Sequence, residues 1–472
     1  TTKKPVDLSQ STLSKNLMAQ EHSSHSPTPS PVTANNPKLE ITEQSNSDKI
    51  MIESVMAPIL EKHERIAGLV WQFQGIYELL LNNLTNDAWE IRHGAALGLR
   101  EIVKKHAKSV GRIKGKSLKE NGHRNSKALE DLATRLLTIF ALDRFGDFVY
   151  DTVVAPVRES AAQTLAALLI HLDNDLSIKI FSALEQLVLQ DPKVIGLPTK
   201  IWEATHGGLL GIRYFVSIKA DFLYQNNLLN NVVNIVLYGL NEHDDDVQSV
   251  AAAILAPITS EFVTLEAATI DLVLSTIWNS LSHLDDDLSS SVGAVMNLLA
   301  KLCEHQEVLN VLKDKAIACP LEWSFKGLVP KLYPFLRHSI TNVRKAVLNL
   351  LLAFLSIQDD STKHWINGKI FRLVYQNILL EQNKEILDMS FKVYFMMLEE
   401  YRSKNFEKNL DHVFGKHLAP ILHLLITPIG EQGKNYNMEL QYILKPSQHY
   451  QLHSEKKRRS SSSSTIKPDI PP

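Results

Sequence analysis

Apolar residues recur at helical spacing between Lys49 and Ile429, with breaks, and no alternation typical of β-strands recurs in the sequence. Within these limits, a leucine repeatedly ends one apolar segment, a polar turn follows, and an apolar residue seven positions later begins the next segment. This pattern predicts pairs of helices, each pair joined by a polar turn and about 40 residues long. It occurs at five places, namely Leu84/Ile91, Leu240/Val247, Leu281/Leu288, Leu336/Val343 and Leu380/Leu387.

Three of the predicted second helices carry an arginine directly after an early apolar residue, at Arg92, Arg158 and Arg344. Units of this length, with Asp or Asn in the turn and then Val-Arg, resemble HEAT repeats. We count about seven units, with a degenerate last one near Asp411–Ile429. Because a helix pair cannot bury its apolar faces alone, consecutive pairs must stack. The sequence therefore predicts an all-α fold, a HEAT-repeat α-solenoid in which antiparallel helix pairs form a superhelix with disordered ends.

One stretch of sequence occurs twice in related form. Trp89–Arg100 reads WEIRHGAALGLR and Trp202–Arg213 reads WEATHGGLLGIR, with the shared residues 113 positions apart. Each copy is expected to begin a second helix directly after its turn. Both copies contain glycines four residues apart, which predicts one helix face that a neighbouring helix approaches closely. These glycines are Gly94 and Gly98 in the first copy, and Gly207 and Gly211 in the second.

The apolar pattern divides the chain into three parts. Residues 1–48 are rich in Ser, Thr, Asn, Gln and Pro and bury too little apolar surface to offset their ordering entropy, so we predict a disordered linker. Residues 49–430 form the predicted solenoid, and residues 431–472 form a polar tail with a KKRR cluster and a serine run. Because the chain begins and stops in polar sequence, without an initial methionine, we expect it to be a piece of a longer protein.

The composition excludes several classes of protein. Hydrophobic residues make up 44% and charged residues 22% of the chain, which is ample for a core, and the formal net charge of −2 implies no polyelectrolyte partner for the whole chain. Two cysteines, Cys303 and Cys319, are too few for a disulfide framework or a cysteine-rich zinc module. No run of about 18 apolar residues could span a bilayer, so we expect no membrane partner.

A basic segment extends from Arg100 to Lys127, and we expect a long loop at about residues 108–127. Ten Lys or Arg residues occur in it against two acidic residues, Glu101 and Glu120. A solvated, mobile loop would explain this composition, and so would contact with phosphate groups or with an acidic partner. The cations are Arg100, Lys104, Lys105, Lys108, Arg112, Lys114, Lys116, Lys119, Arg124 and Lys127.

The opposite polarity follows between Ala220 and Ala300, where eleven carboxylates and no Lys or Arg occur. Two Asp triplets in this stretch fall in equivalent turns of adjacent units, so stacking should place them side by side on one edge. Turn and capping chemistry accounts for one Asp in each turn, but three exceed that need. We therefore favour a surface for a basic protein partner over a divalent-cation site. The triplets are Asp244, Asp245 and Asp246, and Asp285, Asp286 and Asp287.

The sequence contains no motif that indicates catalysis. HExxH, CxxC and GxSxG are absent. The nearest approach to a phosphate-binding loop, Gly111–Ser117, has three residues between its glycines where a P-loop needs four, and no predicted strand precedes it. We interpret His93 and His206 as structural histidines rather than ligands. We therefore expect no enzymatic activity, no metal site and no cofactor in this chain.

Three strings together resemble the amino-terminal region of one family, namely NDAWEIRHGAALGLREIVKKH, VAPVRESAAQTLAALL and IWEATHGGLLGIRYFV. The family is that of the TATA-box-binding-protein-associated factors of the SWI/SNF-type ATPase superfamily, called modifier of transcription in yeast. The resemblance covers about residues 49–429. The duplicated WExxHG motif is specific, because a general HEAT scaffold would not carry it twice.

The resemblance implies a nuclear transcription regulator whose HEAT array binds TATA-box-binding protein. In the family, a carboxy-terminal helicase-like ATPase uses ATP and Mg²⁺ to remove that protein from promoter DNA, and this ATPase is missing from the chain. We expect a monomer that reaches promoter DNA indirectly through its partner. The alternative is a general HEAT adaptor, such as a nuclear-transport receptor or a phosphatase scaffold, that uses the same acidic edge for a basic cargo.

The acidic triplets and the duplicated motif together give the expected partner-binding residues. Each tryptophan of the motif opens a second helix at the rim of the array, where its ring can anchor a partner or cap the gap between units. The candidates are Trp89, Glu90, Trp202, Glu203, Asp244, Asp245, Asp246, Asp285, Asp286 and Asp287. A candidate nuclear-import signal in the tail consists of Lys456, Lys457, Arg458 and Arg459.

Overall fold

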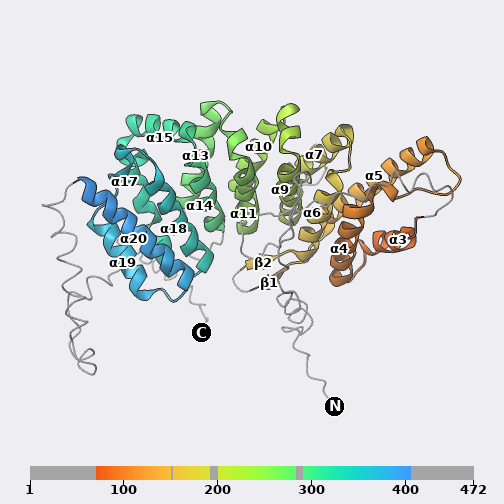
Figure 1. Ribbon diagram of the computed structural model, residues 1–472, viewed down its shortest axis with the longest axis horizontal. Helices are drawn as coiled ribbons and strands as arrows, with labels where there is room; N and C mark the ends of the chain where they lie inside the picture. The colour runs from red at the N-terminus through yellow and green to blue at the C-terminus, as the bar shows by residue number, and fades with distance from the viewer. Residues whose placement is uncertain (1–70, 150–151, 192–199, 283–290, 405–472) are drawn as a thin grey trace, which may run out of the picture.

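The computed structural model of the chain describes residues 71–149, 152–191, 200–282 and 291–404. Most of these residues lie in helix pairs that follow one another along a curved row (Figure 1). The first helices are α3 (Gln74–Asn83), α5 (Leu118–Leu142), α7 (Asn174–Leu189), α10 (Leu229–Leu240), α13 (Ala267–Ser282) and α19 (Gly368–Leu380). The second helices are α4 (Trp89–His106), α6 (Pro156–Leu169), α9 (Trp202–Gln225), α11 (Asp245–Leu255), α14 (Ser291–Leu302), α18 (Thr341–Ser356) and α20 (Lys384–Lys404).

Shorter elements complete the row. Before α18, the 3₁₀ helix η3 (Val329–Arg337) takes the place of a first helix, because two prolines prevent regular α-helical hydrogen bonding there. The elements between α14 and η3 are α15 (Gln306–Ala318), α16 (Pro320–Trp323) and α17 (Phe325–Leu328). The remaining short helices are η1 (Ala107–Ser109), η2 (Ala256–Ile258), α12 (Thr259–Phe262) and η4 (Asp360–Lys363).

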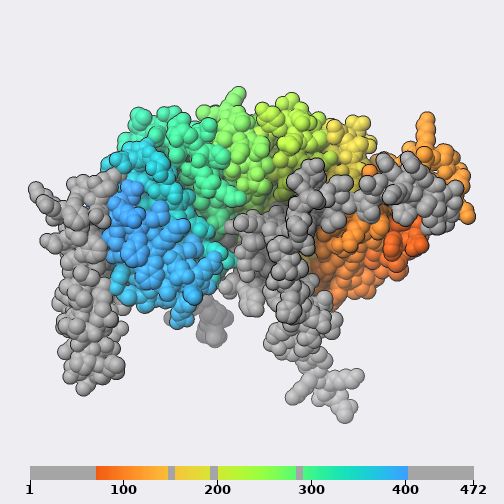
Figure 2. All heavy atoms as spheres, in the orientation of Figure 1, coloured from red at the N-terminus to blue at the C-terminus, as the bar shows by residue number. Residues whose placement is uncertain are grey.

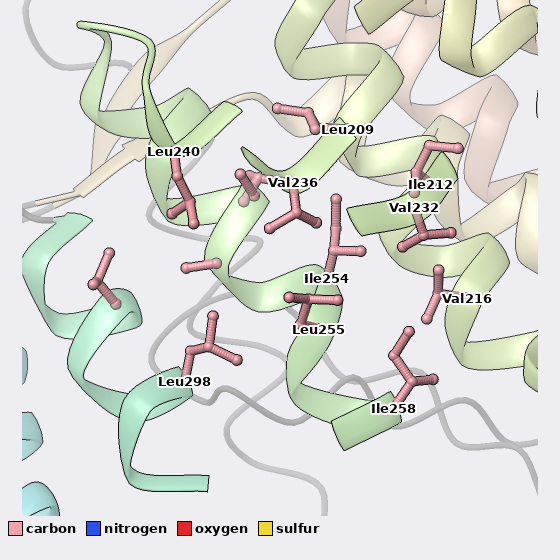
Figure 3. Close-up of a cluster of buried hydrophobic side chains, with 14 of the residues drawn as sticks. Leu209, Ile212, Val216, Val232, Val236, Leu240, Ile254, Leu255, Ile258 and Leu298 are labelled. Atoms are coloured by element: carbon pink, nitrogen blue, oxygen red, sulfur yellow. The ribbon is translucent and has the colours of Figure 1, made fainter. Parts of the chain in front are cut away.

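The second helices pack against one another in chain order, from α4 through α6, α9, α11, α14 and α18 to α20. Figure 1 shows this row from the orange end to the blue end. Figure 3 shows a section of the core in which side chains of α9, α10, α11 and α14 meet, among them Leu209, Val236, Ile254 and Leu298. Each such buried side chain contributes about 1.5–3 kcal/mol to the stability of the stack. The predicted all-α solenoid is therefore confirmed for the described residues.

At two of the turns, the arginine that follows fastens one helix pair to the next. Nη1 of Arg92 donates to two carbonyl oxygens of its own turn, at 2.8 and 2.9 Å, while Nη2 lies 2.7 Å from Oδ1 of Asp143 at the end of α5. Arg344 makes the same two bonds to its own turn, and its Nε lies 2.8 Å from Oε2 of Glu381 at the end of α19. The repeated arginine thus has a repeated structural role.

The glycines of the duplicated motif differ in their surroundings. A Cβ added at Gly207 would lie 2.6 Å from the carbonyl oxygen of Phe140, and one at Gly98 would lie 2.9 Å from a neighbouring leucine side chain. A Cβ at Gly211 would also collide with the adjacent helix. These three positions confirm the predicted close approach. No atom lies within 4 Å of a Cβ added at Gly94, so the prediction that this glycine packs closely is wrong.

Two local predictions are also wrong. Residues 118–127, expected in the long basic loop, form the first part of α5, because Ser117 and Glu120 make a capping box that starts the helix. After α5, the strands β1 (Asp147–Val149) and β2 (Thr152–Val154) pair as an antiparallel hairpin, although the apolar pattern predicts no strand. The β-branched and aromatic residues of the two strands, Phe148, Val149, Thr152, Val153 and Val154, favour this extended conformation over so short a distance.

Several predictions concern residues outside the described part of the chain. These are the linker at residues 1–48, the degenerate unit near Asp411–Ile429 and the tail at residues 431–472. In the segments that the structure describes, no helix is both long enough and apolar enough to cross a membrane.

Candidate functional site

The turns inside the helix pairs line up along one edge of the solenoid. We call this edge, at residues 84–92, 143–149, 155–158, 200–206 and 241–248, the turn edge. Arg92 and Asp143 join its first two turns, and Nε of Arg144 lies 3.9 Å from Oε2 of Glu203 in the third. The β1–β2 hairpin, which connects α5 with α6, lies at this edge as well (Figure 1).

Arg158, on α6, lies at the centre of the turn edge and is only 1% exposed. Its Nη1 donates to the carbonyl oxygen of Glu203 at 3.1 Å, and its Cζ lies 5.4 Å from the centre of the Trp202 ring. Burial lowers the pKa of Arg158, and the carboxylates of Asp143, Glu203 and Asp246 oppose that shift by stabilising the charged guanidinium. Carboxylates from three different turns therefore interact electrostatically with one buried cation.

Trp202 combines a fixed position with an open surface. It is the first residue of α9 and is 41% exposed. The Arg158 guanidinium lies over its ring, and the ring of His206 meets it edge-on with the centroids 6.3 Å apart. A cation over an aromatic face restrains the ring without covering its other side. Trp202 thus packs on its neighbours with one side and leaves part of its ring exposed.

Trp89, the equivalent residue of the first copy, is in a different environment. Its ring stacks on Phe145, with a centroid distance of 4.2 Å and an interplanar angle of 8°. Phe145 follows α5, so the stacked pair closes the gap between two successive units. Trp89 is half-buried, whereas the next residue, Glu90, is exposed. This geometry favours a packing role for Trp89.

The first acidic triplet lies at the start of α11. The side chain of Asp244 caps this helix by accepting hydrogen bonds from the backbone N–H groups of its second and third residues, at 3.1 and 3.0 Å. Asp245 accepts a hydrogen bond from Oγ of Ser291, at the start of α14, at 3.2 Å. All three carboxylates of the triplet are half-buried. Capping chemistry thus accounts for Asp244, while Asp245 reaches toward the next unit.

Crowding of these carboxylates leaves unbalanced negative charge at the turn edge. Burial, together with Asp244 and Asp245, raises the pKa of Asp246 to about 6, and Arg158 opposes only part of that shift. Burial also raises the pKa of Asp244. A positively charged group placed against this turn would stabilise the ionised carboxylates, which are poorly hydrated there. The electrostatics therefore favour a basic partner.

The two histidines of the duplicated motif are in the structural positions that the sequence predicts. Burial, with Arg158 and Arg213 nearby, lowers the pKa of His206 to about 3, so its ring stays neutral. Nδ1 of His93 lies 3.0 Å from the carbonyl oxygen of Pro156. Across residues 71–404, apart from the three undescribed gaps, no group of three or more His, Cys, Asp or Glu side chains could hold a metal ion.

The structure brings together only part of the predicted site. Trp202, Glu203 and Asp246 meet around Arg158, whereas Trp89 and Glu90 lie further along the edge. The second triplet, Asp285–Asp287, and the candidate import signal, Lys456–Arg459, lie outside the described residues.

The sequence analysis identifies Arg158 as a recurring residue of the repeat. It misses that the side chain of Arg158 lies among Trp202 and the carboxylates of three turns. The same holds for Asp143, which pairs with Arg92 and also stabilises the charge of Arg158. The recurrence of Arg92 and Arg158 at equivalent positions is the signal that could have drawn attention to both. Phe145 carries no such signal, because its stacking partner is 56 positions away.

The chain is similar over its whole length to a segment of a curated yeast protein. It is 70% identical over 475 residues to the TATA-binding protein-associated factor MOT1 of Saccharomyces cerevisiae, and the match covers 100% of this chain and 25% of the relative. It is 38% identical over 365 residues to the human TATA-binding protein-associated factor 172, covering 76% of this chain and 18% of the relative. The chain thus spans about a quarter or less of the length of these relatives.

A family model and solved structures give further matches. The model, described as a domain of unknown function (DUF3535), matches residues 393–471. The crystal structure of the Mot1 N-terminal domain in complex with TBP matches with a TM-score of 0.47 and 20% identity, covering 77% of this chain and 41% of that chain. The designed armadillo repeat protein YIII(Dq)4CqI matches with a TM-score of 0.31 and 16% identity, covering 58% and 98% of the two chains.

Proposed function

Because the chain belongs to the MOT1 family of TATA-binding protein-associated factors, we propose that its solenoid binds TATA-box-binding protein and that the turn edge makes the contact. The observation that carries this assignment is the exposed Trp202 ring beside half-buried carboxylates around Arg158. An aromatic anchor beside complementary charge is the arrangement that binding hot spots share. TATA-box-binding protein is a basic DNA-binding protein, and the acidic edge complements its charge.

The family suggests how partner binding and ATP hydrolysis are divided between regions of the full-length protein. We assign partner binding to this chain. ATP-driven removal of TATA-box-binding protein from promoter DNA belongs to the helicase-like ATPase of the family, which would supply the ATP and Mg²⁺ chemistry. This chain would then act in the nucleus by holding the protein that the ATPase displaces.

A general HEAT adaptor for basic cargo would use the same surface, but the comparisons favour the first function. The adaptor function would rest on the repeat architecture alone, whereas the 70% identity over the whole length of the chain is to a TATA-binding protein-associated factor. Architecture alone does not specify a partner, so the support for this choice comes from the sequence identity and not from the fold.

The two ends of α9 provide a matched test. Trp202 opens this helix at the turn edge, and Tyr224, which is 58% exposed, lies near its other end. Trp202→Ala should weaken binding of purified TATA-box-binding protein by about 30-fold, the loss of about 2 kcal/mol that is typical of a hot spot. Tyr224→Ala should leave the affinity unchanged. Equal affinities for both variants, with unchanged melting temperatures, would contradict the proposal.

A further inference from the structure

The basic segment of the sequence forms a separate lobe that the turn edge does not explain. We define the basic lobe as residues 104–128, which include the end of α4, η1, the following loop and the first turns of α5. It contains nine Lys or Arg residues and one carboxylate, Glu120. Figure 1 shows α5 reaching past α4 at the orange end of the solenoid, and Figure 2 shows that end as a projection from the body.

Hydrogen bonds between its loop and α5 give the basic lobe a fixed shape. Nδ2 of Asn125 donates to the carbonyl oxygens of Ala107 and Val110 at 2.7 and 2.8 Å, and Nε of Arg124 donates to that of Gly111 at 3.2 Å. These bonds fasten the loop along the side of α5, and two glycines with positive φ let the loop turn back on itself. No side chain of α5 is buried before residue 129. Apart from Ala107, Ser109 and Val110, which are buried, the lobe is therefore an ordered extension of the core.

Five lysines of the basic lobe are exposed to solvent. Within the described structure, none of them forms a hydrogen bond or an ion pair with another residue. Two of them lie eight residues apart on α5, with His123 halfway between them, so they form one stripe along the helix. The five are Lys105, Lys108, Lys114, Lys119 and Lys127.

The composition of the basic lobe decides between two kinds of acidic partner. Protein interfaces are enriched in aromatic residues and depleted in lysine, and residues 104–128 contain no Phe, Trp or Tyr. Single-stranded nucleic acids are bound largely by stacking on aromatic rings, which the lobe lacks as well. Lysine without aromatic residues fits the phosphate backbone of a duplex, which is contacted through charge alone.

We propose that the basic lobe binds the phosphate backbone of duplex DNA without reading its sequence. The choice of DNA over another duplex polyphosphate rests on the proposed function, whose partner sits on promoter DNA. The contact uses side chains and not the amino-terminal end of α5, because the capping box already occupies that end. The segment Gly111–Ser117 contributes Lys114 and Lys116 to this surface as a turn, not as a P-loop.

The position of the basic lobe allows both partners to bind together. The turn edge lies at the beginning of α4 and the lobe at its end, and α4 has 18 residues. At 1.5 Å per residue, the two surfaces are about 27 Å apart. A protein held at the turn edge would therefore leave the lobe free to contact the DNA that continues beyond that protein.

The test compares three forms of the full chain for binding to duplexes of two unrelated sequences, at 50–200 mM salt by fluorescence anisotropy. The lobe variant carries Lys114→Gln, Lys119→Gln and Lys127→Gln. The control variant removes the same charge from exposed lysines elsewhere. Those three changes are Lys179→Gln, Lys326→Gln and Lys392→Gln. The tail cluster KKRR is present in all forms, so its contribution cancels.

The lobe variant should reduce the slope of log affinity against log salt by about 3, since each lost phosphate contact removes about 0.9. The control variant should match the wild type, and the two sequences should bind alike. An unchanged slope in the lobe variant, or tighter binding of an RNA duplex of the same sequence, would overturn the proposal. Affinity for TATA-box-binding protein without DNA is measured in parallel, and it should be equal in all three forms. If the wild type does not bind TATA-box-binding protein, the proposed function is refuted, whereas the proposed phosphate contact is not affected.

Discussion

At the scale of single residues, the chemistry of the turn edge follows from one buried arginine. Arg158 can remain charged inside the stack because Asp143, Glu203 and Asp246 surround it. Asp246 is less well compensated, since burial and its two acidic neighbours raise its pKa to about 6. The folded protein therefore binds a proton between about pH 4 and pH 6 that the unfolded chain does not.

The first prediction concerns the pH dependence of stability. Between about pH 4 and pH 6, Asp246 makes stability fall as pH rises, because its pKa is higher in the folded state than in the unfolded state. Asp246→Asn removes this contribution, so the variant should melt above the wild type at pH 7 and approach it at pH 4.5. Thermal melts at both pH values test this. The exposed Asp221→Asn is the control, and a constant difference between Asp246→Asn and wild type at both values would show that Asp246 is not the source.

The second prediction uses one repeat position with two environments. Gly94 and Gly207 are equivalent, yet a Cβ at Gly207 would meet the backbone of Phe140, whereas one at Gly94 would meet nothing. Gly207→Ala should therefore destabilise the protein by about 1–3 kcal/mol through overpacking. Gly94→Ala should stabilise it by up to about 1 kcal/mol through helix propensity. Chemical denaturation measures both, and effects of the same sign would contradict the close-approach argument.

These residues also mark what the sequence could predict at this scale. Spacing places Gly98, Gly207 and Gly211 correctly on packed faces, because helical periodicity is a local property. It fails for Gly94, because the open space there depends on where the neighbouring helix ends. Likewise, the stacking of Trp89 on Phe145 depends on the course of the chain after α5, which no local pattern records.

At the scale of elements, Arg92 and Arg344 each lock one helix pair to the next from the position that follows the turn. Arg344 bonds to its own turn and to Glu381, and both side chains are largely shielded from water. Breaking a buried ion pair leaves an uncompensated charge, which costs far more than breaking an exposed pair. The stacking of these two units therefore depends in part on the arginine.

The third prediction follows from that lock. Arg344→Met should lower the free energy of unfolding by about 3 kcal/mol, because Glu381 stays buried without its counter-charge. Arg135 pairs with Asp131 on the open surface of α5, and Arg135→Met should cost no more than about 1 kcal/mol. Denaturant unfolding of both variants provides the comparison. Equal losses would mean that burial does not determine the strength of these pairs.

Element boundaries show why a solenoid can be predicted more reliably than its connections. The leucine and arginine pattern locates the second helices, and α4 and α9 begin at Trp89 and Trp202 as predicted. The start of α5 is missed because a basic composition suggests a loop, although Ser117 and Glu120 form a capping signature. The β1–β2 hairpin is missed because its strands have only three residues each.

At the scale of the whole molecule, charge is separated between two surfaces. The turn edge carries clustered carboxylates, and the basic lobe carries available lysines at the other end of α4. A rigid solenoid keeps such surfaces at a fixed distance, because each unit contacts only its neighbours. Under the two proposals made above, a basic protein and a polyphosphate would bind at the same time to separate surfaces.

The most direct test of the central claim is the affinity of the chain for TATA-box-binding protein after both acidic triplets are neutralised, the one at the turn edge and the one outside the described residues. In the variant that we call the edge variant, all six aspartates of the two triplets are replaced by Asn, which can still cap α11 in place of Asp244. A control variant neutralises six exposed acidic residues elsewhere. These are Asp175, Asp221, Glu304, Glu307, Glu322 and Asp388.

Because clustered charge mainly controls association and its salt dependence, the edge variant should bind about tenfold more weakly at low salt and with a flatter salt dependence. The control variant should bind and melt like the wild type, and the edge variant, which contains Asp246→Asn, should melt no lower than the wild type at pH 7. An edge variant that keeps the wild-type affinity and salt dependence would contradict the assignment of the turn edge as the binding surface.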